Sequence, residues 1–225
     1  MEQKKKRKFR PFYNFCYDFV KVTGLPGALL WLRPKLHYPE GKPKKTGPLM
    51  VISNHPTWID PILVQVAFPF RRMNSLATKD LFGTEAKLRF FTLMHCIIVD
   101  KENFSLSSFH EVVSRLEEGK LVLIFPEGHV NVDGTAKMDA FKSGAVLMAH
   151  RAGAPILPMY IVKRKKWYQR QHIVMGQPVD VAGLLGKMPS MQALNQVNDL
   201  LREKEESLKS CFESLPVYEK YKLDT

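Results

Sequence analysis

Cysteine is scarce in this sequence, whose 225 residues include only three: Cys16, Cys96 and Cys211. They are an odd number, lie far apart and form no C-x-x-C pair, so the sequence indicates neither a disulfide framework nor a structural zinc site. This cysteine usage is typical of a reducing compartment. We therefore expect a domain held by its hydrophobic core, and 225 residues are enough to build one.

Long apolar runs are also missing. The nearest candidates, Leu25–Leu32 and Pro61–Phe70, are far shorter than the eighteen or so uncharged residues that a membrane-spanning helix needs. The basic N-terminus is not followed by the apolar stretch and small-residue cleavage site of a secretion signal. We expect a protein that stays in the cell, at the cytoplasmic face of a membrane, peripheral or monotopic.

Acidic residues are in the minority, with 22 Asp and Glu against 34 Lys and Arg, a formal net charge of +12. Such an excess predicts an anionic partner, which can be nucleic acid, a phosphorylated metabolite or an anionic membrane. Six basic side chains and one acid lie in the first ten residues, MEQKKKRKFR. The charge alone does not choose among these partners.

Aromatic residues follow the basic start. Apolar side chains recur with the spacing of an amphipathic helix, at positions 9, 12, 13, 16, 19 and 20. We expect Gly24, Pro26 and Gly27 to end this helix. A basic run joined to an aromatic helix is typical of an interfacial membrane anchor; a solvated tail followed by a helix packed on the core is the alternative.

The rest of the chain alternates short apolar runs with helical patterns, which predicts an α/β fold with a mixed, mostly parallel sheet flanked by helices. The expected organisation is a membrane-binding segment at 1–37, a linker at 38–48, the main domain at 49–185 and a helical segment at 186–225. Expected strands are Leu49–Ser53, Met73–Thr78, Cys96–Val99, Leu121–Phe125, Ile156–Val162 and His172–Met175. Expected helices are Pro61–Phe68, Gly83–Met94, Ser107–Glu118, Ala140–Arg151 and Ser190–Leu215.

Two expected strand ends carry polar residues, and sites in α/β folds collect at such ends. After the strand at 49–53, His55 and Asp60 are separated by four residues, and a tight turn between them can bring the carboxylate to the imidazole Nδ1. Nε2 is then left to take a proton from a hydroxyl, as in the base–orienter pair of hydrolases. A structural histidine at the start of a helix is the alternative. No G-x-S-x-G occurs in the chain, so the base would activate a substrate hydroxyl.

The two strand ends together have the form of motifs from one enzyme family. Asn54-His55-x4-Asp60, followed by Phe125-Pro126-Glu127-Gly128, resembles the glycerolipid acyltransferases that acylate lysophosphatidic acid. Further blocks resemble those of the family in the same order: Ile97–Lys101, Phe141–Ala145, Gly153–Pro158 and Val174–Pro178. The similarity covers residues 49–179.

The resemblance implies a role for each matching residue. His55 would deprotonate the free glycerol hydroxyl while Asp60 holds the imidazole, and the alkoxide would attack an acyl thioester without a covalent acyl-enzyme. Backbone N–H groups of the 55–58 turn or the 125–128 loop would stabilise the oxyanion. The implied donor is acyl-CoA or acyl carrier protein, the implied product is phosphatidic acid, and neither a metal nor another cofactor is implied. The residues expected to bind the acceptor, its phosphate included, are Phe125, Pro126, Glu127, Gly128, Lys79, Lys101 and Lys142.

The chain departs from the family pattern at Lys101, near His95, where glycine is usual, and after Gly128. Lys101 stands where arginine is usual, so it keeps the charge but loses the bidentate guanidinium. His129-Val130-Asn131 follows Gly128 where most bacterial members have Thr-Arg-Ser, and this variant resembles the tafazzin-type transacylases that remodel phospholipids. Acylation or remodelling of another lysophospholipid is therefore the alternative activity.

A second basic cluster, Lys163–Arg170, contains Trp167 and Tyr168. Beside a lipid-active site these residues suit anionic headgroups and the bilayer interface, and a solvated hairpin fits them equally well. Interleaved aromatic and basic residues also occur in nucleic-acid-binding proteins, but we expect no nucleic-acid partner. The alternative from another class of protein is a non-catalytic binder of anionic membranes or nucleic acid, against which the pair of His55 and Asp60 argues.

Overall fold

The computed structural model describes residues 10–81, 83–99, 106–126, 144–164 and 166–218. Within them, a seven-stranded sheet has the order β1-β7-β6-β2-β5-β3-β4. Its strands are β1 (Lys35–His37), β2 (Leu49–Ser53), β3 (Met73–Thr78), β4 (Ile97–Val99), β5 (Leu121–Ile124), β6 (Ile156–Ile161) and β7 (His172–Met175). Neighbouring strands run parallel except β6 and β7, which are antiparallel. The predicted mixed, mostly parallel sheet is confirmed.

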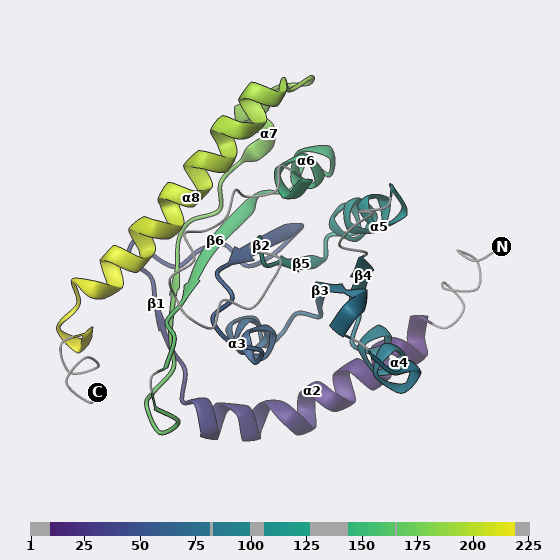
Figure 1. Ribbon diagram of the computed structural model, residues 1–225, viewed down its shortest axis with the longest axis vertical. Helices are drawn as coiled ribbons and strands as arrows, with labels where there is room; N and C mark the ends of the chain where they lie inside the picture. The colour runs from purple at the N-terminus through teal and green to yellow at the C-terminus, as the bar shows by residue number, and fades with distance from the viewer. Residues whose placement is uncertain (1–9, 82, 100–105, 127–143, 165, 219–225) are drawn as a thin grey trace.

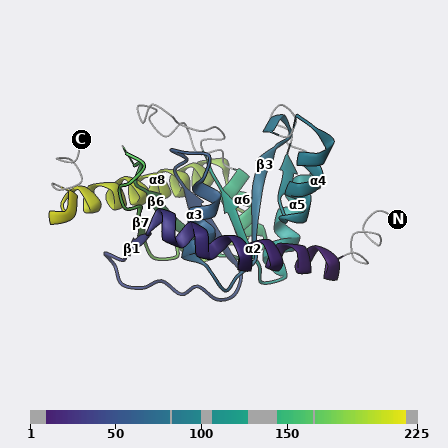
Figure 2. The same ribbon diagram turned by 90° about the horizontal axis from the view of Figure 1, so that it is seen from below.

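Helices cover both faces of this sheet (Figure 1). The helices are α2 (Arg10–Leu32), α3 (Asp60–Ala67), α4 (Glu85–Leu93), α5 (Leu106–Glu117), α6 (Gly144–Arg151), α7 (Val181–Leu185) and α8 (Met191–Glu213), with a short 3-10 helix at Lys79–Leu81. One face is covered by α5 to α8 and the other by α3, with α2 lying across it as Figure 2 shows. In β2, Met50 and Ile52 pack on the first side, whereas Leu49 and Val51 pack on the second. A sheet covered on both sides explains the continuous apolar strands.

The N-terminal helix corrects one expectation. We predicted a break at Gly24, Pro26 and Gly27, but α2 continues through them to Leu32. A proline inside a helix costs about 3 kcal/mol, and packing against the domain offsets this cost: Leu32 is 1% exposed in the core and Ala28 packs beside it. Tertiary contacts that the local sequence does not reveal therefore override the propensity.

The strand β1 was also missed by the sequence reading. It lies inside the segment 1–37 and pairs in parallel with β7, with Lys35 opposite His172. The linker expected at 38–48 contains no helix or strand. The other predicted elements are observed with ends that differ by one or two residues, except the helix at Ala140–Arg151, whose first four residues lie outside the described part.

None of the helices in the described part of the chain combines the length and the apolar character required to cross a bilayer.

Candidate active site

The ends of three neighbouring strands gather the described candidates. Because β2, β5 and β3 are parallel, their carboxyl ends meet at the same edge of the sheet. His55 follows β2, Phe125 and Pro126 follow β5, and Lys79 follows β3. We call this the carboxyl edge, and its opposite, where these strands begin, the amino edge.

His55 and Asp60 are in direct contact at the carboxyl edge. The imidazole Nδ1 lies 2.7 Å from Asp60 Oδ2. An ionised carboxylate can only accept, so Nδ1 carries the proton and donates it to this bond, which leaves Nε2 as the basic nitrogen. Among the described residues no hydrogen-bond partner faces Nε2, and the His55 side chain is 15% exposed. This geometry suits a general base.

Asp60 is held by the turn that precedes it. It is the first residue of α3 and is followed by Pro61, and its side chain is fully buried. Its Oδ2 accepts a hydrogen bond from the Thr57 backbone N–H at 2.7 Å, and its Oδ1 accepts one from the Thr57 hydroxyl at 2.5 Å. With His55 these bonds give the buried carboxylate three donors, which compensate for its lost hydration. Asp60 is therefore fixed as a positioning residue for the imidazole.

Phe125 fixes the other side of the imidazole. Its ring stacks on that of His55 with centroids 3.9 Å apart and an interplanar angle of 12°. The loop after β5, predicted to contact substrate, thus also orients the base. Pro126, the next residue, is buried.

Asn54 joins the active-site turn to the neighbouring strand. Its Nδ2 donates to the Ile161 carbonyl at 2.9 Å, and its Oδ1 accepts from the Ile161 N–H at 2.7 Å. Ile161 ends β6, so this paired contact locks the residue before His55 onto the adjacent strand. The sequence reading assigned Asn54 no function of its own, because its partner lies 107 residues away and no local pattern connects the two.

Comparison with known proteins places these motifs in a family. The family model described as Acyltransferase matches residues 33–162, more than half of the chain. This chain belongs to the Acyltransferase family. The match extends from the residue after α2 to the residue after β6 and includes His55, Asp60 and the loop after β5.

Individual proteins support the assignment to the acyltransferases. The chain is 26% identical over 209 residues to a 1-acyl-sn-glycerol-3-phosphate acyltransferase of Bacillus subtilis, covering 90% of this chain and 100% of that protein. A Streptococcus pneumoniae protein of the same name is 24% identical, covering 78% of this chain and 65% of its own length. The fold resembles the crystal structure of the LPA acyltransferase PlsC from Thermotoga maritima, with a TM-score of 0.58, 20% identity, and 92% and 83% of the two chains covered.

Of the remaining site residues predicted for this acyltransferase, the structure describes only Lys79. Lys79 is exposed at the end of β3, on the carboxyl edge. Lys101, Glu127, Gly128 and Lys142 lie outside the described residues, so their expected roles stay predictions. Among the residues that the structure does describe, no cluster of His, Cys, Asp or Glu is suited to hold a metal ion.

We expect Asn54→Ala to lower kcat with little change in KM, because the turn that carries His55 loses its attachment to β6. A displacement of the base by about 1 Å can cost on the order of a hundredfold in rate. Steady-state kinetics and thermal unfolding would be measured together.

Asn74 provides the control, since it is an asparagine whose side chain also binds a neighbouring strand; it is buried, and its Nδ2 donates to the Leu121 carbonyl at 3.0 Å. It lies near the amino edge, so Asn74→Ala should lower stability comparably and leave kcat unchanged. Equal kcat losses in both variants would mean that Asn54 acts only through stability.

Proposed function

We propose that this acyltransferase moves a fatty acyl group from a thioester, acyl-CoA or acyl carrier protein, to the free hydroxyl of 1-acyl-sn-glycerol 3-phosphate, which yields phosphatidic acid. The observation that carries the proposal is the hydrogen bond of 2.7 Å between His55 and Asp60 at the carboxyl edge. It leaves Nε2 as the base. The names of the relatives from Bacillus subtilis and Streptococcus pneumoniae support this acceptor.

The steps of the proposed acyl transfer follow from the position of His55 Nε2 as the base. Nε2 of His55 takes the proton of the glycerol hydroxyl as its oxygen attacks the thioester carbonyl. The C–S bond then breaks, and the departing thiolate takes the proton back from the imidazolium. Asp60 stabilises the imidazolium between these two transfers.

Direct attack by the acceptor is supported by the surroundings of His55. Ser53, the nearest serine along the chain, is fully buried and its hydroxyl faces Asn54 Oδ1 at 3.3 Å. The hydroxyl of Thr57 is bound to Asp60. Neither is placed as a nucleophile. The backbone N–H of Thr57 is bound to Asp60 as well, so the oxyanion needs other donors, and those of the 125–128 loop remain our prediction.

A position at the membrane surface is part of the proposal, and α2 supports it. Its outward side presents exposed apolar side chains at helical spacing, a set that we call the α2 stripe: Phe12, Phe15, Phe19, Val22 and Leu30. The inward side carries the buried Tyr17, with Asp18 and Lys21 beside it. An ordinary surface helix is polar outside and apolar inside. Apolar residues outside suit insertion among lipid headgroups and acyl chains.

The tryptophans support the same orientation. All three are exposed: Trp31 by 49%, Trp58 by 78% and Trp167 by 75%. Trp58 belongs to the active-site turn. Trp31 lies in the last turn of α2, and this end of the helix lies beside the β6–β7 loop, which carries Trp167 (Figure 1). The Arg164 guanidinium lies 5.1 Å from the Trp31 ring centroid and joins this loop to α2. Exposed tryptophans beside basic residues suit the interface of an anionic bilayer.

The function is tested by assaying the purified full chain with acyl-CoA and acyl carrier protein as donors and several lysophospholipids as acceptors. We expect kcat/KM for 1-acyl-sn-glycerol 3-phosphate to exceed that for lysophosphatidylcholine by roughly tenfold or more, because a phosphate monoester makes stronger charge-assisted contacts. Acyl transfer from an intact phospholipid without any thioester would instead favour the remodelling activity.

A further inference from the structure

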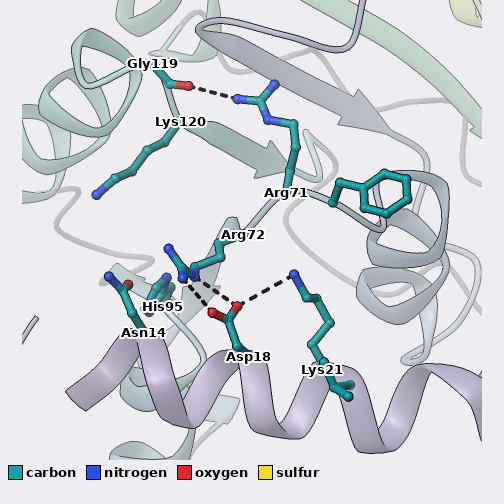
Figure 3. Close-up of a pocket in the computed structure, with 10 residues that line it drawn as sticks. Asn14, Asp18, Lys21, Arg71, Arg72, His95, Gly119 and Lys120 are labelled. Atoms are coloured by element: carbon teal, nitrogen blue, oxygen red, sulfur yellow. Dashed lines mark hydrogen bonds and ion pairs between the residues drawn. The ribbon is translucent and has the colours of Figure 1, made fainter. Parts of the chain in front are cut away.

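A cleft of about 740 Å³ opens at the amino edge of the sheet (Figure 3), whereas His55 follows β2 at the carboxyl edge. Its walls come from the inward side of α2, from residues 70–72 before β3 and from residues 119–120 before β5. Segments far apart in the sequence thus meet around one space of the size of a small-molecule site. The proposed acyl transfer uses none of these residues.

Cations from two of these segments meet at one carboxylate. Arg72 donates to Asp18 from Nε at 2.9 Å and from a terminal nitrogen at 2.5 Å. Lys21 lies 3.6 Å from the same carboxylate, as Figure 3 shows. The guanidinium of Arg72 lowers the pKa of Asp18, which stays ionised at neutral pH. These contacts hold both cations at the cleft, and Asp18 offsets only one of the two charges.

The opposite wall adds two more cations. Arg71 donates to the carbonyls of Lys45, Gly47 and Gly119 at 2.7 to 2.9 Å, which fixes the wall. Its charge is not paired with any carboxylate in these contacts. Lys120 lies 2.6 Å from Glu118. Among the described residues, four cationic side chains line the cleft, and the carboxylates paired with them are Asp18 and Glu118, so these groups together carry a net positive charge.

His95 also lines the cleft, and its pKa is affected by the same positive charges. Its ring stacks on Tyr17 at 4.8 Å between centroids. Burial, followed by the nearby cations Arg115, Lys120 and Arg72, lowers the pKa of His95 to about 4. The imidazole is therefore neutral at pH 7 and lines the cleft without adding charge.

The rim of the cleft is apolar. Val22 and Phe70 line it and are 69% and 97% exposed. Val22 also belongs to the α2 stripe, so the rim continues into the surface that we place against the membrane. These properties suit a ligand with a phosphate group and an acyl chain. The phosphate would contact the cations inside the cleft, and the acyl chain would contact the apolar side chains at the rim.

We propose that this cleft is a non-catalytic binding site for a phosphate group, carried by the headgroup of an anionic phospholipid or supplied as free phosphate. Lysine and arginine side chains are the usual ligands of this anion. The phospholipid source rests on the membrane contact of the proposed function, whereas the free-phosphate source does not depend on it.

The test is calorimetric titration of the full chain with short-chain phosphatidylglycerol, kept below its micelle concentration, and with inorganic phosphate. Phosphatidylglycerol is a phosphodiester, so it is neither the acceptor nor the product of the proposed reaction. We expect saturable binding that Lys21→Ala combined with Lys120→Ala weakens by roughly tenfold or more, as the loss of charge-assisted contacts predicts. Lys42→Ala combined with Lys44→Ala, on exposed residues outside the cleft, removes the same charge and should leave binding unchanged.

The two probes distinguish a phospholipid headgroup from free phosphate as the ligand of the cleft. Phosphatidylglycerol binding that phosphate does not displace assigns the lipid, and equal binding of phosphate assigns the free anion. Absence of saturable binding to either probe, or equal weakening in both double variants, would overturn the site. The cleft variant should keep wild-type turnover on detergent-dispersed acceptor, because His55 lies at the opposite edge, so a failure of the proposed function would be seen separately.

Discussion

Replacing His55 by alanine is expected to remove nearly all acyl transfer, by a factor on the order of a thousand or more, because the acceptor hydroxyl loses its base. Asp60→Asn is expected to cause a similarly severe loss of kcat. An amide at this position can point its NH₂ group at Nδ1, which favours the tautomer that carries its proton on Nε2. The measurement is kcat with a saturating thioester and acceptor in detergent.

A control histidine and a folding measurement complete this experiment. His110 is exposed on α5 and is not among the partners described for His55 and Asp60, so His110→Ala should retain full activity. Asp60→Asn keeps an oxygen for the Thr57 hydroxyl, and circular dichroism should show an unchanged fold. Turnover close to wild type in His55→Ala would disprove the role of this imidazole as the base.

Adding charge to the α2 stripe is expected to release the enzyme from membranes. Burying a phenylalanine contributes about 2 to 3 kcal/mol, so Phe15→Glu combined with Phe19→Glu should weaken vesicle binding by more than about a hundredfold. Co-sedimentation with vesicles of mixed zwitterionic and anionic lipid measures this effect. High salt alone should release the wild type only partly, since salt screens the basic residues and not the apolar contact.

Substitution is a cleaner test here than deletion of the N-terminus. The Tyr17 hydroxyl is bonded to Gln65 and accepts from the Met73 N–H at 2.9 Å, so a deletion would remove part of the core. The matched control is Leu184→Glu combined with Met191→Glu, exposed apolar residues of α7 and α8 on the other side of the sheet. Equal vesicle binding by the stripe variant and the wild type would refute the anchor and favour the β6–β7 loop.

Much of the fold could be predicted because its signals are local. The strands LMVIS and HIVM are buried at every position, and such continuous apolar runs indicate a sheet covered on both faces. The spacing from His55 to Asp60 is also local, since the turn that joins them lies between them. These parts needed no knowledge of distant contacts.

The features that the sequence did not predict depend on contacts between residues that lie far apart in the chain. Lys35–His37 has no strand pattern and becomes β1 only because β7 offers a free edge. The passage of α2 through Pro26 depends on packing by Ala28 and Leu32, and no neighbouring residue of the sequence indicates it. The paired bond of Asn54 with Ile161 spans most of the main domain. The exposure of Phe15 and Val22 could not be derived either, because the periodicity of a helix does not tell which side the rest of the protein covers.

The unbroken course of α2 has a kinetic consequence. The fifteen residues from Asp18, at the amino edge, to Leu32, at the carboxyl edge, extend over about 21 Å. On the membrane contact that we propose, a rod that meets the bilayer along this length leaves the domain free to diffuse laterally but restrains α2 from tilting out of the membrane plane. The mouth of the active site would then keep a constant angle to the lipid surface, and the acceptor would arrive by diffusion in two dimensions. For such an enzyme the rate follows the mole fraction of acceptor in the bilayer, so diluting the acceptor with inert lipid should slow the reaction even when its bulk concentration is constant.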